Sequence, residues 1–215
     1  EGKKISKSLG NTIDPYEIIN EYGLDQIRYF LFSEVPFGND GDFSKKAISQ
    51  RINADLSNNY GNLIQRIFSF IKKNCNSIIT NEFKLIDEDK KILEESIQCY
   101  KNYLNYMNNQ LIDKALKEIF SLLSQINTYV DNQEPWALKK TNKDRMNVVL
   151  SVSAELIKRS TILLYPIIPS SCEKVFSIIN VNKEKITLKN YEGLPNKEVI
   201  INNPFPIFPR IEIND

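Results

Sequence analysis

Apolar side chains recur at steps of three and four residues between Ser44 and Asn74, a spacing that places them on one face of a helix. The members of this apolar stripe are Ile48, Ile52, Leu56, Tyr60, Leu63, Ile67 and Ile71. Ser44 stands just before the stripe, where its hydroxyl can accept from the free N–H groups of the first turn. The pattern predicts one long helix with a buried face.

The outward face of this predicted helix carries Asn62 and Arg66, which are one turn apart and lie far from the centre of the apolar stripe. Two interpretations are open for this pair. It is either part of an ordinary solvated face or a pair of hydrogen-bond donors presented to a ligand lying across the helix.

Similar helical periodicity extends from Asp87 to about Met107, from Leu111 to Val130 and from about Lys143 to Leu164, followed by a shorter helix to about Asn180. Two short helices are expected before the long one, the first beginning at Asp14-Pro15 and ending at Gly23, and the second capped by Asp25. Amphipathic helices joined by short polar links pack as antiparallel bundles. The sequence therefore predicts a mainly α fold, an antiparallel helix bundle.

The last part of the chain, beyond Val181, is irregular and richer in proline and β-branched residues. The segment 203–209 contains three prolines in alternation with apolar residues, so it cannot be helical and is too apolar to remain in solvent. We expect this tail to lie extended in a groove of the bundle.

Composition excludes several kinds of site. The chain contains no histidine, which rules out a Ser-His-Asp triad, a Cys-His pair and a His-ligated zinc within these residues, and we expect no metal site. The three cysteines, Cys75, Cys99 and Cys172, are far apart and are expected to be reduced. No apolar run is long enough to cross a bilayer. Proteins that bind duplex DNA along its backbone are usually much more basic than this chain, whose net charge is +1. We therefore expect no DNA binding, and any nucleic-acid contact should be local.

A compact site for polyanions is predicted near the start of the chain, in the run Lys4-Ile5-Ser6-Lys7-Ser8. Its two ammonium groups stand three residues apart with hydroxyls beside them, and a lysine ammonium suits phosphate oxygens that move during a reaction. A helix begins shortly afterwards at Asp14-Pro15, so the loop is followed by a helix N-terminus. A solvated surface loop is the alternative.

The longer run KISKSLGNTIDP resembles the KMSKS signature of class I aminoacyl-tRNA synthetases, with Ile5 in the place of the usual methionine. The resemblance implies that Lys4, Ser6, Lys7 and Ser8 bind ATP, with Mg²⁺. It also implies that Lys7, supported by Lys4, stabilises the leaving pyrophosphate, where negative charge builds in the transition state. The family's His-Ile-Gly-His signature is absent, so we expect a C-terminal fragment that is inactive alone.

Further segments resemble the methionyl-tRNA synthetases within this class. They are the linker 35–44, the helix segments 51–55 and 61–66, and the tripeptide Glu134-Pro135-Trp136. The resemblance implies a catalytic loop with a stem-contact remnant at 1–43, an anticodon-binding bundle at 44–180 and an extended C-terminal segment at 181–215. It implies cytoplasmic location and, as partners, tRNA(Met), with methionine and ATP bound through the missing catalytic domain.

In this family the bundle reads the first anticodon base, cytosine, and by position the residues are Asn62, Arg66 and Trp136. We expect Pro135 to belong to the same site, because it fixes the chain just before Trp136 and helps present the ring. Trp136 is the sole tryptophan and is either a core anchor or a platform for a stacked base. Its position in a polar stretch, 131–135, which we expect to be a loop, favours the platform.

Two alternatives concern this end of the bundle and the function as a whole. The basic residues that follow, Lys139, Lys140, Lys143 and Arg145, are either a solvated helix start or phosphate contacts. The chain as a whole is alternatively a piece of another class I enzyme, such as the cysteine or leucine synthetase, or a non-catalytic RNA-binding module.

Overall fold

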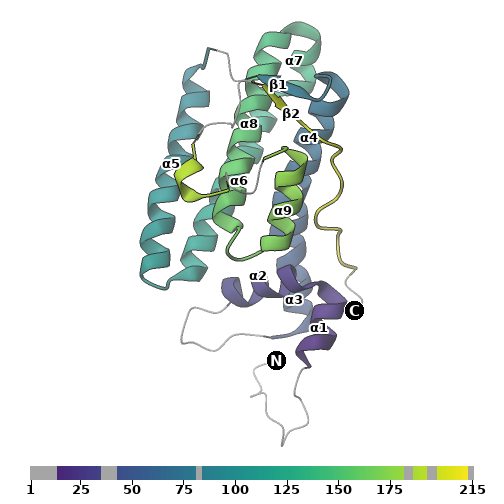
Figure 1. Cartoon of the computed structure of the whole chain (residues 1–215), viewed down its shortest axis with the longest axis vertical. Coiled ribbons are helices and arrows are strands. Elements are labelled where there is room, and N and C mark those ends of the chain that lie inside the picture. Colours follow the sequence, from purple (N-terminus) through teal and green to yellow (C-terminus); the bar gives the residue numbers. More distant parts are fainter. Residues whose placement is uncertain (1–13, 35–42, 81–83, 182–185, 193–197, 213–215) are drawn as a thin grey trace, which may run out of the picture.

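The computed structural model describes residues 14–34, 43–80, 84–181, 186–192 and 198–212 (Figure 1). The predicted polyanion loop, Lys4 to Ser8, and most of the linker 35–44 lie outside these described residues. The nine α-helices within them are α1 (Pro15–Tyr22), α2 (Leu24–Glu34), α3 (Lys45–Arg51), α4 (Asn62–Asn74), α5 (Asp87–Asn108), α6 (Ile112–Gln133), α7 (Pro135–Thr141), α8 (Lys143–Leu164) and α9 (Pro169–Ile178).

The long helices α5, α6 and α8 form the body of the bundle, with α4 and α9 beside them (Figure 1). Helices α1, α2 and α3 gather at one end of the molecule, and α7 lies at the other. Helix α8 is the central element, since every residue from Val148 to Leu164 is buried. The predicted mainly α bundle is therefore confirmed.

Helix starts follow the predicted capping residues in two of three cases. The carboxylate of Asp14 accepts from the Tyr16 N–H at 2.8 Å, and the hydroxyl of Ser44 accepts from the Ala47 N–H at 3.1 Å. The prediction for Asp25 is wrong. Helix α2 already begins at Leu24, and the buried Asp25 carboxylate accepts instead from the Ser171 N–H at 2.6 Å, in the first turn of α9. A buried carboxylate is stabilised at a helix N-terminus, even that of a different helix.

The predicted long helix from Ser44 to Asn74 is continuous but not uniformly α-helical. Its middle part, Ile52–Gly61, is a π-helix between α3 and α4, and the Asn62 N–H accordingly donates to the carbonyl five residues earlier, at Ser57. All seven members of the apolar stripe are buried, as the periodicity predicted.

Two short strands, β1 (Ile78–Thr80) and β2 (Glu198–Ile200), were not predicted. They pair antiparallel with Ile78 opposite Ile200, and they bury Ile79 and Val199. A short 3₁₀-helix, Leu188–Asn190, precedes β2.

The C-terminal tail lies extended against the bundle, as expected. Ile207 and Phe208 are buried, and the Phe208 ring packs 6.1 Å from that of Tyr60. The Asn53 side chain in the π-helix holds the tail by donating to the Ile211 carbonyl and accepting from the Ile211 N–H, both at 2.8 Å. The amide therefore pairs with the tail as a neighbouring strand would.

Two expectations on composition can be compared with the described residues. All three cysteines have free thiols, and Cys99 and Cys172 are buried. No helix in the described ranges has both the length and the apolar character needed to cross a membrane.

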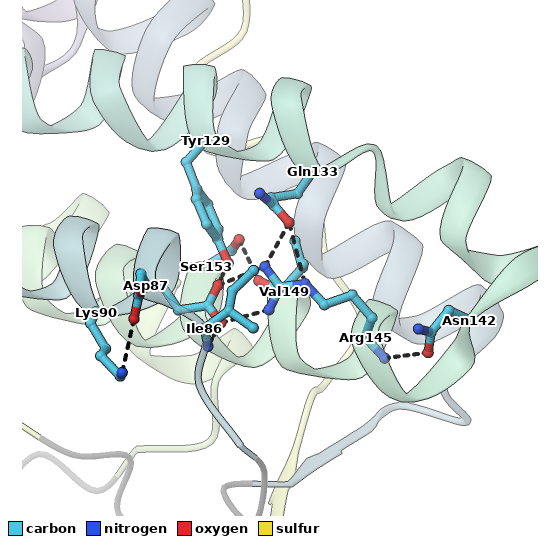
Figure 2. Close-up of polar contacts among 10 residues, drawn as sticks. Ile86, Asp87, Lys90, Tyr129, Gln133, Asn142, Arg145, Val149 and Ser153 are labelled. Atoms are coloured by element: carbon cyan, nitrogen blue, oxygen red, sulfur yellow. Dashed lines mark hydrogen bonds and ion pairs between the residues drawn. The ribbon is translucent and has the colours of Figure 1, made fainter.

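A buried polar network joins α5, α6 and α8 near the end of α6 (Figure 2). The Arg145 guanidinium donates to both oxygens of the fully buried Asp89 carboxylate, at 2.5 and 2.8 Å, and also to the Gln133 side chain. The Tyr129 hydroxyl donates to Asp89 at 2.6 Å. Burial alone would raise the pKa of Asp89, but these hydrogen bonds and that of the Ile86 N–H lower it.

The network gives a prediction for stability. Replacement Asp89→Asn should lower the free energy of unfolding at pH 7 by about 3 kcal/mol, because it leaves the Arg145 charge buried without a counterion. Since the folded protein lowers the pKa of Asp89, its contribution exists above the unfolded pKa of about 4 and is lost as the pH falls through the lower folded value.

Urea unfolding of both proteins from pH 7 to pH 3 measures this contribution. The difference in free energy of unfolding between the wild type and Asp89→Asn should shrink as the pH approaches 3. Asp87→Asn is the control, because Asp87 is exposed and pairs with Lys90 at the surface, so its stability should stay near that of the wild type. An equal effect of the two substitutions would contradict the account.

Candidate nucleic-acid interface

The end of α6 and the start of α7 are joined by a single residue. Glu134 adopts the left-handed conformation, with φ 45° and ψ 59°, and Pro135 occupies the first position of α7. The expectation that 131–135 forms a polar loop is wrong, because 131–133 complete the last turn of α6. One left-handed residue suffices to redirect the chain, and the fixed φ of proline suits a helix start.

Trp136 is therefore the second residue of a helix. The residue is 43% exposed, whereas Pro135 before it is buried. The buried proline fixes the backbone at the point from which the indole projects. An exposed part of an aromatic ring next to a rigid helix start can accept a stacked base.

Arg66 reaches this indole from α4. Its Cζ atom lies 5.7 Å from the centroid of the Trp136 ring, within the range of a cation–π contact. Its Nη2 atom also donates to Asp131 of α6 at 2.6 Å. The structure thus brings together two predicted residues that are 70 positions apart in the sequence.

Asn62 begins α4 one turn before Arg66, and its side chain is exposed. Both residues therefore lie on one side of the same α-helix. Within the described ranges Arg66 donates only through Nη2, which leaves other N–H groups for a ligand. The pair offers donors from Arg66, and both a donor and an acceptor from Asn62.

Asp131 is a neighbour that the sequence reasoning did not single out. It forms an ion pair with Arg66, and both side chains are partly exposed, Arg66 at 34% and Asp131 at 57%. An ion pair at this exposure adds little stability, but it restricts the orientation of the guanidinium. The only sequence signal was its place five residues before the sole tryptophan.

The basic residues after Trp136 do not form one group. Lys139, Lys140 and Lys143 are exposed, so both alternatives, a solvated helix start and phosphate contacts, stay open for them. Neither alternative describes Arg145, since its guanidinium is engaged by Asp89 and Gln133 in the buried network (Figure 2). Its charge is already balanced by Asp89.

The described residues hold no cluster of three or more His, Cys, Asp or Glu side chains that could bind a metal ion. Lys4, Ser6, Lys7 and Ser8 lie outside these residues, so their predicted arrangement has no geometry to report.

Family models match the chain in two consecutive parts. Residues 1–68 match "tRNA synthetases class I (M)", and residues 80–196 match "Anticodon binding domain of methionyl tRNA ligase". The helix bundle and the aromatic, basic site at its end, together with these matches, define a class I aminoacyl-tRNA synthetase chain.

Similar proteins with curated names identify the family within this class. The methionine–tRNA ligase of Brucella suis is 43% identical over 97% of this chain, and that of Helicobacter pylori is 38% identical over 99%. The chain belongs to the methionyl-tRNA synthetase family. It spans 41% of the Brucella protein and 32% of the Helicobacter protein.

Solved structures agree with this assignment. The Mycobacterium tuberculosis methionyl-tRNA synthetase in complex with methionyl-adenylate superposes with a TM-score of 0.92 and 32% identity, over 97% of this chain and 42% of that one. The free form of the same enzyme gives a TM-score of 0.89. The matches favour the methionine enzyme over the cysteine and leucine enzymes.

Proposed function

We propose that this chain is the C-terminal part of a methionine–tRNA ligase, a cytoplasmic enzyme that uses ATP with Mg²⁺ to attach methionine to tRNA(Met). In this proposal residues 1–43 supply the ATP-binding loop and stem-contact remnant, 44–180 bind the anticodon, and 181–215 return along the body. Methionine and most of the ATP site belong to the missing catalytic domain. Family membership and the likeness to an adenylate-bound relative support the proposal.

The anticodon role rests on one observation, the Arg66 guanidinium held over the half-exposed Trp136 ring with Asn62 on the adjoining turn. Proteins read RNA sequence mainly on unpaired loop bases, which stack on aromatic rings and form hydrogen bonds along their edges. An indole and two polar side chains next to it supply both kinds of contact. Pro135 contributes by fixing the start of α7.

Cytosine fits the charges of this site. Its O2 and N3 atoms are acceptors, which a donor-only guanidinium such as that of Arg66 can satisfy. Its exocyclic amine is a donor, which a nearby carboxylate such as Asp131 can accept. Uracil keeps the O2 acceptor but presents an N–H at position 3 and an acceptor at position 4, so the contacts to N3 and to the exocyclic amine would be lost. The site therefore favours cytosine over uracil.

One prediction from the proposed function concerns anticodon binding by the 215-residue chain. An anticodon stem-loop with cytosine as the first base should bind more tightly than one with uracil. Trp136→Ala should weaken binding of the cytosine loop by about 1–3 kcal/mol, the value of one stacked base. Titrations followed by fluorescence anisotropy of labelled RNA measure both effects.

Trp136→Phe is the matched variant, because it keeps an aromatic face and should retain most of the affinity. Equal affinity for the two loops would exclude the proposed reading of the first base. Equal binding by Trp136→Ala and the wild type would exclude the stacking platform.

The loop from Lys4 to Ser8 carries the second prediction. In the full-length enzyme, Lys7→Ala should lower the rate of ATP–pyrophosphate exchange by about 10²–10³-fold, because a charge that acts on the transition state is removed. The substitution Lys46→Ala on the exposed side of α3 is the control and should leave the rate unchanged. An unchanged rate in Lys7→Ala would favour the alternative, a non-catalytic RNA-binding module that retains the loop.

A further inference from the structure

Helix α6 runs parallel to the segment formed by the π-helix and α4, and two polar contacts connect them at equivalent positions. Asn59 pairs with Ser124, and Arg66 pairs with Asp131. In each pair the partners are separated by 65 residues. A step of seven residues along one helix therefore corresponds to seven along the other, which is about two turns.

Asn59 uses both ends of its amide in this contact. Its Nδ2 atom donates to the Ser124 hydroxyl at 3.0 Å and lies 3.4 Å from the Phe120 carbonyl, while its Oδ1 atom accepts from Asn127 at 2.9 Å. The Asn127 amide is itself fixed by donating to the Leu123 carbonyl at 3.1 Å. The Asn59 side chain thus spans two successive turns of α6.

This arrangement fixes the axial register of the two helices. A shift of one residue moves a helix by about 1.5 Å and turns its side chains by about 100°. Such a shift would break the directional bonds of Asn59 and would also remove Arg66 from Asp131 and from the Trp136 ring.

The other contacts between α6 and the segment formed by the π-helix and α4 are less suited to fixing their axial register. Packing of apolar side chains is non-directional. The Arg66–Asp131 pair is half-exposed and joins a long, flexible side chain to a carboxylate, so it adds little energy. The half-buried hydrogen bonds between the amides of Asn59 and Asn127 are the directional contact, and Asn59 lies about two turns before Arg66.

We propose that Asn59 is a positioning residue for anticodon reading: by locking the register of α4 against α6, it holds Arg66 opposite Asp131 and Trp136. This inference rests on the proposed function of Arg66 and Trp136. Asn59 itself need not touch the RNA, and its effect on base discrimination passes through the Arg66 guanidinium.

The test is a double-mutant cycle in the 215-residue chain, with the ratio of affinities for the cytosine and uracil stem-loops as the readout. Asn59→Leu keeps the branched shape of the side chain but loses all three polar contacts, and it should lower the ratio about five-fold. In an Arg66→Ala background the same substitution should have no further effect on the ratio. Coupling of this kind is not expected from a general loss of stability.

Two other variants keep the test decisive. Asn127→Ala removes one of the three contacts and should lower the ratio in the same direction by less, which covers the case in which Asn59→Leu does not fold. Asn102→Leu is the matched control, because Asn102 also joins two helices through its amide, to Glu118 at 3.3 Å between α5 and α6. It should leave the ratio unchanged.

The outcomes distinguish this inference from the proposed function. Suppose that Arg66→Ala abolishes the preference for the cytosine stem-loop, but Asn59→Leu and Asn127→Ala leave the affinity ratio unchanged. This result would overturn the positioning role of Asn59 and leave the proposed function standing. Equal additional loss in the Arg66→Ala background would also overturn it. A wild-type chain that binds both loops equally would instead overturn the proposed function.

Discussion

The position of the C-terminal half of α6 is the constraint on which the candidate site depends. On one side the Asn59 amide holds α6 against the π-helix, and on another the Asp89–Arg145 network holds it against α5 and α8. Because α7 leaves α6 through the single left-handed residue Glu134, these contacts also determine where the indole projects. The partly exposed ring is therefore supported by directional contacts, of which the Asp89–Arg145 network is the well-shielded part.

Much of the fold could be predicted from the sequence, because apolar periodicity and capping residues are local signals. The stripe from Ile48 to Ile71 is buried, and Ser44 caps its helix. The π-helix could not be predicted this way, since the four-residue spacing of Ile52, Leu56 and Tyr60 is compatible with an α-helix as well as with the wider π-helical turn. The strands β1 and β2 have three residues each, too few for a period, and form only when distant segments meet.

In the candidate site, too, individual residues could be identified from the sequence, but their partners on distant helices could not. Arg66 and Trp136 were identified by family resemblance, and the structure supplies their contact. Asp131 was missed, and the buried ion pair of Arg145 was not among the two alternatives considered for it, for a common reason. The partner of each lies on another helix, 65 residues away for Asp131 and 56 for Arg145, so neither pairing leaves a local pattern in the sequence.

The sole tryptophan allows a direct measurement of the central claim, that a nucleobase stacks on the indole next to the guanidinium. Emission of Trp136 can be followed while the cytosine stem-loop is added to the chain, with RNA binding measured in parallel by a label on the RNA. The account predicts quenching that saturates together with binding and is much weaker for the uracil loop. RNA that binds with full affinity while the emission stays constant would contradict it.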